Sequence, residues 1–260
     1  MENIYRATEL VGEAYGKFIG DASPEVRTWL VHKLKHTFGV AHDIMDIFQN
    51  EKAIYELFSP QERRMVEISG ILHDLGRFYQ HKDGKNLSNK VFDHGAEAVK
   101  MLQDMPYFGD KRLLFAIYEH NRREINYKNP LYVALPDKEK QQAAIMAKLL
   151  RDADKLENIK CFAYYGIDRL GKAPDGVLSE PIKQDLLNKQ TIDYSNIKTA
   201  TDGLAMILSW NNDIYYATTV KRLKEIDFIN LGIEAVSQHG SSNEDLELLR
   251  ENIFYHTVGD

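Results

Sequence analysis

The chain has 260 residues, of which 43% are hydrophobic and 28% are charged, and its formal net charge is −6. No run of about 18 apolar residues occurs, which argues against a membrane-spanning helix. An acidic chain without a long basic stripe is also a poor partner for duplex nucleic acid. The single cysteine, Cys161, rules out an intramolecular disulfide framework, and the first residues show no signal-peptide pattern. We therefore expect a cytoplasmic protein.

Two proline-containing signals predict the first long helices. Ser23 followed by Pro24 is typical of a cap and first turn, and it predicts a helix that runs towards Asn50. Ser59 and Pro60 with a glutamate at position 62 repeat the signal, and they predict a second helix that continues through positions 73–74. Within the first helix, the basic segment KLKH at 33–36 is interpreted as a solvated face.

Three aspartates predict the next helices. Asp93 can cap a helix over 94–104, Asp110 one that ends near residue 121, and Asp137 a long helix that reaches about residue 158. Between the second and third helices, the polar segment 81–92 contains the expected turn Asp83-Gly84.

The remainder of the chain is less regular. Glycine and proline interrupt 166–200, and the segment 166–181 is a candidate lid. Further helical segments are expected over 201–210 and near 213–225 and 243–255. Tyr164, Tyr165 and Trp210 are expected to be core aromatics. Because no strand alternation of useful length occurs, we predict an all-α fold.

Six potential metal ligands lie on or beside these helices. Histidine and aspartate together suit iron, manganese, zinc or nickel. One ion rarely needs six protein ligands, whereas two ions that share a bridging carboxylate do, so the set predicts a dinuclear site. The six residues are His36, His73, Asp74, His94, His120 and Asp154.

The spacing of neighbouring residues supports several of these ligands but leaves alternatives open. His120 shares a stripe with Leu113, Ala116 and Ile117, which also fits a hydrogen-bonded core histidine. The small residues Ser69 and Gly70 before the His-Asp pair would let another helix approach. The pair is interpreted as lying in mid-helix. His32 could replace His36, and Asp154 could be salt-bridged to Arg151 or Lys155. His42 is expected to be a surface residue.

Five segments also resemble the HD-domain superfamily of helical, metal-dependent phosphohydrolases. The resemblance covers about 36–158, and its HDLGRF form is most similar to an uncharacterised bacterial branch that often reads HDIGRF. In that branch a helical tail carries a tryptophan and an aspartate near the spacing of Trp210 and Asp213. The five segments are HTFGV at 36–40, ILHDLGRF at 71–78, DHGAE at 93–97, IYEHN at 117–121 and RDADKLEN at 151–158.

The resemblance implies a fold and a cofactor. We expect one helical domain over 1–260, with a bundle of the HD-domain type over about 25–160 and additional helices over 161–260. The resemblance assigns His36, His73, Asp74 and Asp154 to a first ion. Asp74 bridges to a second ion that is held by His94 and His120. The expected ions are two divalent metals among iron, manganese, cobalt, nickel, zinc and magnesium, with no other cofactor-binding residues.

The resemblance also implies hydrolysis of a small phosphate ester or a nucleotide, as a phosphomonoesterase or a phosphodiesterase. Asp74 and Arg77 are the candidate catalytic residues. Arg77 could bind a phosphate oxygen or form an ion pair with Asp74 or Asp154. Asn121 and Lys155 are further candidates for substrate binding. The chain lacks the GYP signature of the cyclic-dinucleotide branch and the acidic residues that follow HD in the alarmone hydrolases and mononuclear deoxynucleotidases.

Two other functions are possible: one shares the ligand pattern, and the complete ligand set argues against the other. Members of the superfamily that resemble inositol oxygenase use a mixed-valent di-iron pair, and a degenerate domain could bind a nucleotide or metal as a regulator. Arg77, which suits an anionic substrate, favours hydrolysis. The sequence carries no signal for an oligomeric state.

Overall fold

The computed structural model describes residues 2–82, 85–86, 92–165, 177–189, 192–238 and 241–255. Apart from one antiparallel pair of two-residue strands, β1 (His81–Lys82) and β2 (Lys85–Asn86), the regular elements of these residues are helices. The all-α prediction is confirmed. No helix in the described part is both long and apolar enough to cross a membrane. The expected turn at Asp83-Gly84 lies outside the described residues.

The chain divides into two compact units, Met1–Asp154 and Lys155–Asp260. The expectation of a single domain over the whole chain stays a prediction. The first unit contains α1 (Glu2–Ile19), α2 (Pro24–Asn50), α3 (Lys52–Tyr55), α4 (Pro60–Leu72), α5 (Leu75–Phe78), α6 (His94–Leu102), α7 (Lys111–Glu119), α8 (Pro130–Val133) and most of α9 (Asp137–Tyr165).

The predicted start signals act as caps. The Ser23 hydroxyl accepts a hydrogen bond from the backbone N–H of Val26 at the start of α2. At the start of α4, Ser59 and Glu62 each bond the other's backbone N–H, over 3.4 and 2.7 Å. These reciprocal bonds satisfy donors that a helix start leaves unpaired, and both predicted starts are confirmed.

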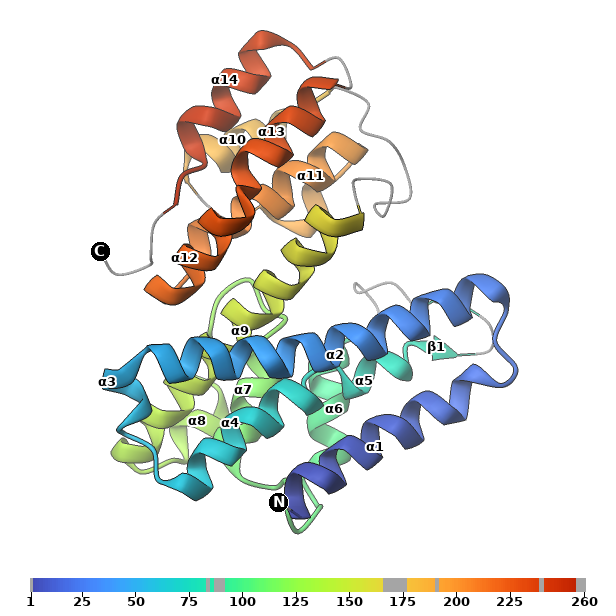
Figure 1. Cartoon of the computed structure of the whole chain (residues 1–260), viewed down its shortest axis with the longest axis vertical. Helices are drawn as coiled ribbons and strands as arrows, with labels where there is room; N and C mark the ends of the chain where they lie inside the picture. Colours follow the sequence, from blue (N-terminus) through green and yellow to red (C-terminus); the bar gives the residue numbers. More distant parts are fainter. Residues whose placement is uncertain are drawn as a thin grey trace. The chain divides into compact units, whose positions relative to one another are not determined.

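The helices α1, α2 and α4 pack against one another (Figure 1). Where α2 and α4 meet, a Cβ added at Gly70 would lie 2.8 Å from the Cα of Ala41. Only glycine permits this approach of the two backbones. The prediction that small residues before the His-Asp pair admit another helix is therefore confirmed.

The interpretation of the His-Asp pair as mid-helical is wrong. α4 ends at Leu72, His73 follows as its cap, and Asp74 has φ −98° and ψ 14° before α5 begins. The break lets α5 pack on α6. At Gly76 an added Cβ would lie 2.2 Å from the carbonyl oxygen of His94, so the contact requires glycine.

The aspartate signals predict the later starts well and the ends less well, although Asp137 is the first residue of α9 rather than its cap. Asp93 and Asp110 accept hydrogen bonds from the first turns of α6 and α7. The helices end at Leu102 and Glu119, two residues before the expected ends, whereas α9 continues to Tyr165 rather than about 158. Helix ends depend on contacts beyond the local sequence, which explains the weaker prediction.

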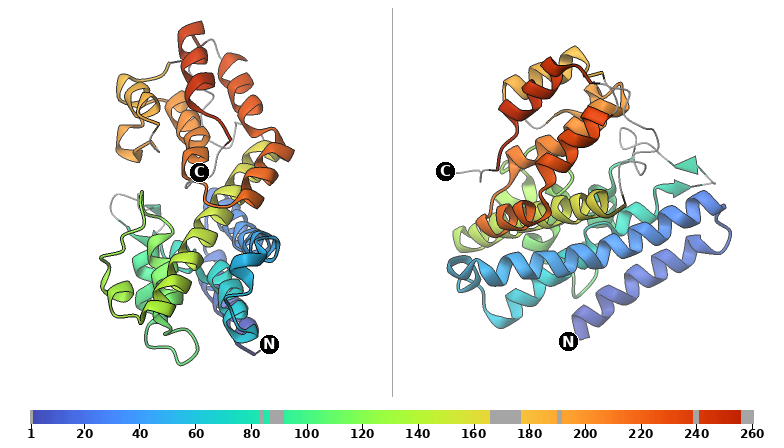
Figure 2. Two further views of the ribbon diagram at one scale, coloured as in Figure 1. Left: turned by 90° about the vertical axis from the view of Figure 1, so that its left-hand side faces the viewer. Right: turned by 45° about the horizontal axis from the view of Figure 1, so that its top comes forward.

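The second unit contains the end of α9 and a further set of helices (Figure 2). Asp202 is buried and accepts backbone N–H bonds from Ser179, Lys198 and Thr199, so it joins separate segments of this unit. The elements are α10 (Glu180–Leu187), η2 (Tyr194–Asn196), α11 (Ala200–Ser209), η3 (Trp210–Asp213), α12 (Ala217–Ile226), α13 (Phe228–Gln238) and α14 (Asn243–Asn252).

The sequence predictions for this unit were partly wrong. α11 begins at Ala200 with Thr199 as its cap. The helices α10 and α13 are not among the predicted elements. α10 lies in the segment 166–200, which the sequence indicates to be irregular. Positions 166–176 of the candidate lid lie outside the described residues, as do the side chains of Tyr164 and Tyr165; Trp210 is partly exposed.

Candidate metal centre

The six candidate ligands come from five places in the first unit and meet around one carboxylate, that of Asp74. Two groups of potential ligand atoms are found among the described residues, and Asp74 belongs to both. The elements that supply the six are α2 (His36), the junction of α4 and α5 (His73 and Asp74), the first turn of α6 (His94), the cap of α7 (His120) and α9 (Asp154).

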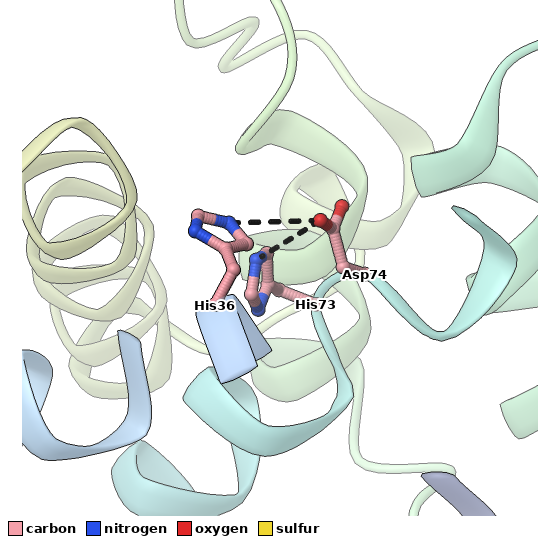
Figure 3. Close-up of side chains that lie close together, drawn as sticks. All are labelled: His36, His73 and Asp74. Atoms are coloured by element: carbon pink, nitrogen blue, oxygen red, sulfur yellow. Dashed lines mark ion pairs between the residues drawn. The ribbon is translucent and has the colours of Figure 1, made fainter. Parts of the chain in front are cut away.

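The first group lies on the Oδ2 side of Asp74 (Figure 3). The Nε2 atoms of His36 and His73 lie 3.6 and 3.7 Å from Oδ2. Asp154 approaches the same two rings, with its Oδ1 3.0 Å from Nε2 of His36 and 3.9 Å from Nε2 of His73. Two imidazoles and two carboxylates therefore converge on this side.

The second group lies on the Oδ1 side of Asp74. The Nε2 atoms of His94 and His120 lie 3.4 and 3.7 Å from Oδ1. They lie 3.1 Å from each other, at hydrogen-bond distance. Asp74 thus presents a different oxygen to each pair of histidines, which is the arrangement that a bridging carboxylate needs.

Backbone carbonyls orient two of the rings. Nδ1 of His73 donates to the carbonyl oxygen of Gly70 over 2.7 Å, and Nδ1 of His120 donates to that of Ile117 over 2.6 Å. Because a carbonyl only accepts, the proton of each neutral ring lies on Nδ1 and the Nε2 lone pair faces the centre. This outer contact is the usual support of a metal-binding histidine.

The hydrogen bonding of the buried histidine nitrogens shows whether these residues fit a metal. Nε2 of His73 is buried and has no hydrogen-bond partner among the described residues, while Nε2 of His36 faces Oδ1 of Asp154 over 3.0 Å. A buried polar atom without a partner is costly, and a divalent cation held by these nitrogens and the nearby carboxylates would remove that cost. The donor set fits the expected borderline divalent ions.

Burial and charge set suitable protonation states. Burial lowers the pKa of His73 to about 4, and burial followed by the charge of Arg77 holds the pKa of His94 well below its usual value. Burial acts in the opposite direction on Asp74, but Lys33 and then His73 outweigh it, and the pKa of that carboxyl is well below its ordinary value. Neutral imidazoles and an ionised carboxylate are the forms that bind metals.

Lys33 is a site residue that the sequence analysis missed. Its Nζ lies 3.0 Å from Oδ2 of Asp74, and its side chain is only 13% exposed. The interpretation of KLKH as a solvated face is therefore wrong for this position. Lys33 precedes His36 by three residues and shares its face of α2, and that spacing is the signal that could have identified it.

Arg77 lies on the other side of the carboxylate. Its Nε is 3.4 Å from Oδ1 of Asp74, and one guanidinium nitrogen donates to Oε1 of Gln80 over 2.9 Å. The ion pair with Asp74, one of the two roles that the sequence left open, is present in the structure. A role in substrate binding stays a prediction.

The other candidate substrate-binding residues have protein partners. Nδ2 of Asn121 lies 3.1 Å from Oδ1 of Asp93 and 3.3 Å from Nδ1 of His94, so Asn121 supports a candidate ligand. Lys155, in the second unit, binds the carboxylate and carbonyl oxygen of Asp213. Their roles towards substrate stay predictions.

Arg151, which the sequence offers as a salt-bridge partner of Asp154, makes contacts that indicate a further role. It is buried on α9 and donates to the carbonyl oxygens of Glu119, His120 and Arg123 over 3.1, 3.4 and 3.0 Å, and also to that of Arg122. The last carbonyls of a helix lack partners within the helix. Arg151 satisfies them at the end of α7 and fixes the backbone that carries His120.

His32 and His42 lie outside the two ligand groups found among the described residues. The rings of His32 and His36 lie 6.1 Å apart, and the two ligand groups found in the described residues contain His36 rather than His32. The side chain of His42 is 80% exposed, which confirms the prediction of a surface residue.

Comparison with known proteins gives one result at the level of the family. Residues 34–159 match the family model of the HD domain, and this interval contains all six candidate ligands. No curated protein and no solved structure matches the chain.

Proposed function

With the HD-domain superfamily supported by residues 34–159, we propose that the protein is a metal-dependent hydrolase that cleaves a small phosphate ester or a nucleotide through two divalent ions. The observation that carries this proposal is the position of Asp74. Its two oxygens face two separate pairs of imidazoles, at distances of 3.4 to 3.7 Å.

The chain's own residues would hold the ions in two groups. His36, His73 and Asp154 would hold the first ion with Oδ2 of Asp74, and His94 and His120 would hold the second with Oδ1. Iron, manganese, cobalt, nickel and zinc suit these donors better than magnesium, which prefers oxygen ligands.

Bound divalent ions supply an activated water for attack on phosphorus and neutralise phosphate charge. The protein contributes positioning and electrostatic stabilisation, which is most of what phosphoryl transfer requires. Gln80 orients the guanidinium of Arg77, so that Arg77 can donate to phosphate oxygens from the edge of the centre. Burial lowers the pKa of His73 and of His94, which keeps these two rings neutral and able to bind metal at neutral pH.

A screen of the metal-loaded protein tests the proposal. Phosphomonoesters, phosphodiesters and nucleotides are assayed with manganese, iron, cobalt and nickel, with and without oxygen. Phosphate-ester cleavage that does not depend on oxygen is the expected result. Oxygen consumption without hydrolysis, by protein that contains two irons, would replace the proposal with a di-iron oxygenase.

Arg77→Ala provides the matched variant for this screen. Loss of one donor to a transition state typically lowers turnover by about 10- to 1,000-fold, and we expect this decrease with unchanged metal content and folding. Arg64→Ala, on α4, is a suitable control for loss of an arginine, because Arg64 lies outside both ligand groups.

A further inference from the structure

Two cations share the single carboxylate at the middle of the centre. Nζ of Lys33 lies 3.0 Å from Oδ2 of Asp74, and Nε of Arg77 lies 3.4 Å from Oδ1. The cations come from different elements, α2 and α5, and approach different oxygens. Together they therefore flank Asp74.

The exposure of these side chains shows which of them a solute can reach. Asp74 has a side-chain exposure of 3%, whereas Lys33 has 13% and Arg77 has 18%. The carboxylate is enclosed, whereas the side chains of Lys33 and Arg77 are partly exposed, with Nε of Arg77 itself buried. A small anion would approach the exposed parts of these two side chains.

Metal binding would change the charge balance around the two cations. If divalent ions bind as proposed above, they add positive charge beside Lys33 and Arg77, which lie 3.0 and 3.4 Å from the oxygens of Asp74. A cluster of positive charges of low exposure attracts an anion. The metal-loaded centre is therefore suited to an anionic group that reaches both side chains.

We propose that Lys33 and Arg77 together bind the terminal phosphate of the substrate, and that the substrate is a phosphomonoester rather than a phosphodiester. This inference rests on the proposed hydrolytic function. A phosphomonoester carries about 1.5 to 2 negative charges near pH 7, whereas the phosphoryl group of a diester carries one. Two cations match the monoester in charge, and its three unsubstituted oxygens can accept hydrogen bonds from both.

The corresponding reaction balances without any other reactant. The oxygen of water attacks phosphorus and forms a new P–O bond, while the P–O bond to the ester oxygen breaks. The leaving oxygen takes one proton of the water, so an alcohol and inorganic phosphate are the products. Lys33 and Arg77 hold the phosphoryl oxygens and are unchanged in charge.

Phosphate binding tests the inference without using activity. Inorganic phosphate is titrated calorimetrically into metal-loaded protein and its variants, with dimethyl phosphate as the monoanionic probe. Lys33→Met is expected to weaken phosphate binding by about 10- to 100-fold, the usual effect of losing a hydrogen bond to a charged group. Dimethyl phosphate is expected to bind more weakly than phosphate and to respond less to Lys33→Met.

Lys35→Met is the matched control, because Lys35 lies two residues away on α2 and is exposed; it should leave phosphate binding unchanged. Lys33→Arg keeps the charge and should retain most of the binding, even if Lys33→Met folds poorly. Unchanged phosphate binding in Lys33→Met, with metal content intact, would overturn the inference. Equal losses in Lys33→Met and Lys35→Met would also overturn it, because general charge would then explain the effect.

Kinetics separate this inference from the proposed function. Cleavage of 4-nitrophenyl phosphate should exceed that of bis(4-nitrophenyl) phosphate, and Lys33→Met should lower kcat/KM for the monoester more than for the diester. Preferential cleavage of the diester would overturn the monoester assignment and leave the hydrolase proposal intact. If neither ester is cleaved and oxygen is consumed, the hydrolase proposal fails, and with it the assignment of a phosphomonoester substrate.

Discussion

The two sides of Asp74 differ in the contacts that their histidines make. On the Oδ2 side, Nε2 of His73 is buried without a hydrogen-bond partner among the described residues, and Nε2 of His36 lies 3.0 Å from Oδ1 of Asp154. On the Oδ1 side, the Nε2 atoms of His94 and His120 lie 3.1 Å apart and can bond to each other. The histidines of the first side face carboxylates, whereas those of the second side contact each other.

This difference predicts unequal affinities for the two proposed ions. On the first side, metal binding satisfies Nε2 of His73, which lacks a partner among the described residues, and places two carboxylates beside the ion. On the second side, binding must break the contact between His94 and His120, and Asp74 is the carboxylate of that ligand group. A first ion should therefore bind more tightly than a second, and the following variants test this order.

Asp74→Ala should have the largest effect, because Asp74 is the residue that faces both pairs of histidines. We expect loss of both ions and of metal-dependent activity, measured as metal stoichiometry in the purified variant and as turnover. Asp110→Ala is the control. It removes a helix cap at a cost of about 1 kcal/mol and should leave the metal stoichiometry unchanged. Equal stoichiometry in Asp74→Ala and the parent protein would exclude the bridging role.

A substitution of a ligand on one side of Asp74 should affect the binding of one ion only. His94→Ala is expected to lose the weakly bound ion and keep the tightly bound one, while Asp154→Ala should weaken the tightly bound ion. Metal titrations followed by calorimetry would show which binding step changes. If both variants altered the same step, the division of the centre into two sides would be wrong.

The pH dependence of stability tests the burial of the first side. The pKa of His73 is about 4 in the folded protein, compared with 6.5 as its ordinary value, so between these pH values the unfolded chain binds the additional proton. The stability of the metal-free protein should therefore fall as pH decreases from 6.5 to about 4, by about 3 kcal/mol from this residue.

Chemical denaturation at several pH values would measure this slope. Asp74 and Asp154 have folded pKa values below their ordinary 3.8, so their contributions are lost only at lower pH. His73→Gln should flatten the profile in part, whereas His42→Gln, at an exposed position, should not change it. An equally steep profile in His73→Gln would assign the effect to other groups.

Arg151→Met should have a smaller effect that is confined to the second side. Arg151 fixes the carbonyls after α7, and loss of an outer support typically lowers metal affinity by about 10- to 100-fold. Arg112→Met is the control, because Arg112 bonds Asp110, Glu62 and Gln142 instead. Both variants should melt at lower temperature, but only Arg151→Met should weaken the second binding step. Equal weakening in both would show that stability alone determines metal affinity.

Local signals in the sequence predicted where several helices begin. Ser23 with Pro24, Ser59 with Glu62, and Asp93 each act within about one turn of the residue that they cap. The information needed for a cap lies within three residues, so the sequence contains it. The starts of α2, α4 and α6 could therefore be predicted without knowledge of the rest of the fold.

Contacts between distant segments decided what the sequence could not. Lys33 and Asp74 are 41 residues apart in the chain, and the ion pair between them depends on the packing of α2 against α4 and α5. Gly76 fits against His94 only because α5 turns away from α4, which places the His-Asp pair at a break rather than in mid-helix. The spacing of Lys33 from His36 indicates that the two share a face of α2, but the local sequence does not give the partner of Lys33 or of Gly76 in these packing contacts.

The sequence by itself determined the types of the six candidate ligands and their order along the chain, which were sufficient to indicate the HD-domain superfamily. Only the tertiary structure decided that Asp74 presents one oxygen to each pair of histidines, that Lys33 and Arg77 flank it, and that Arg151 supports His120. The physical reason is the range of the interactions. Residue types and caps act over a few positions, whereas the directions of these side chains follow from helix packing across the first unit.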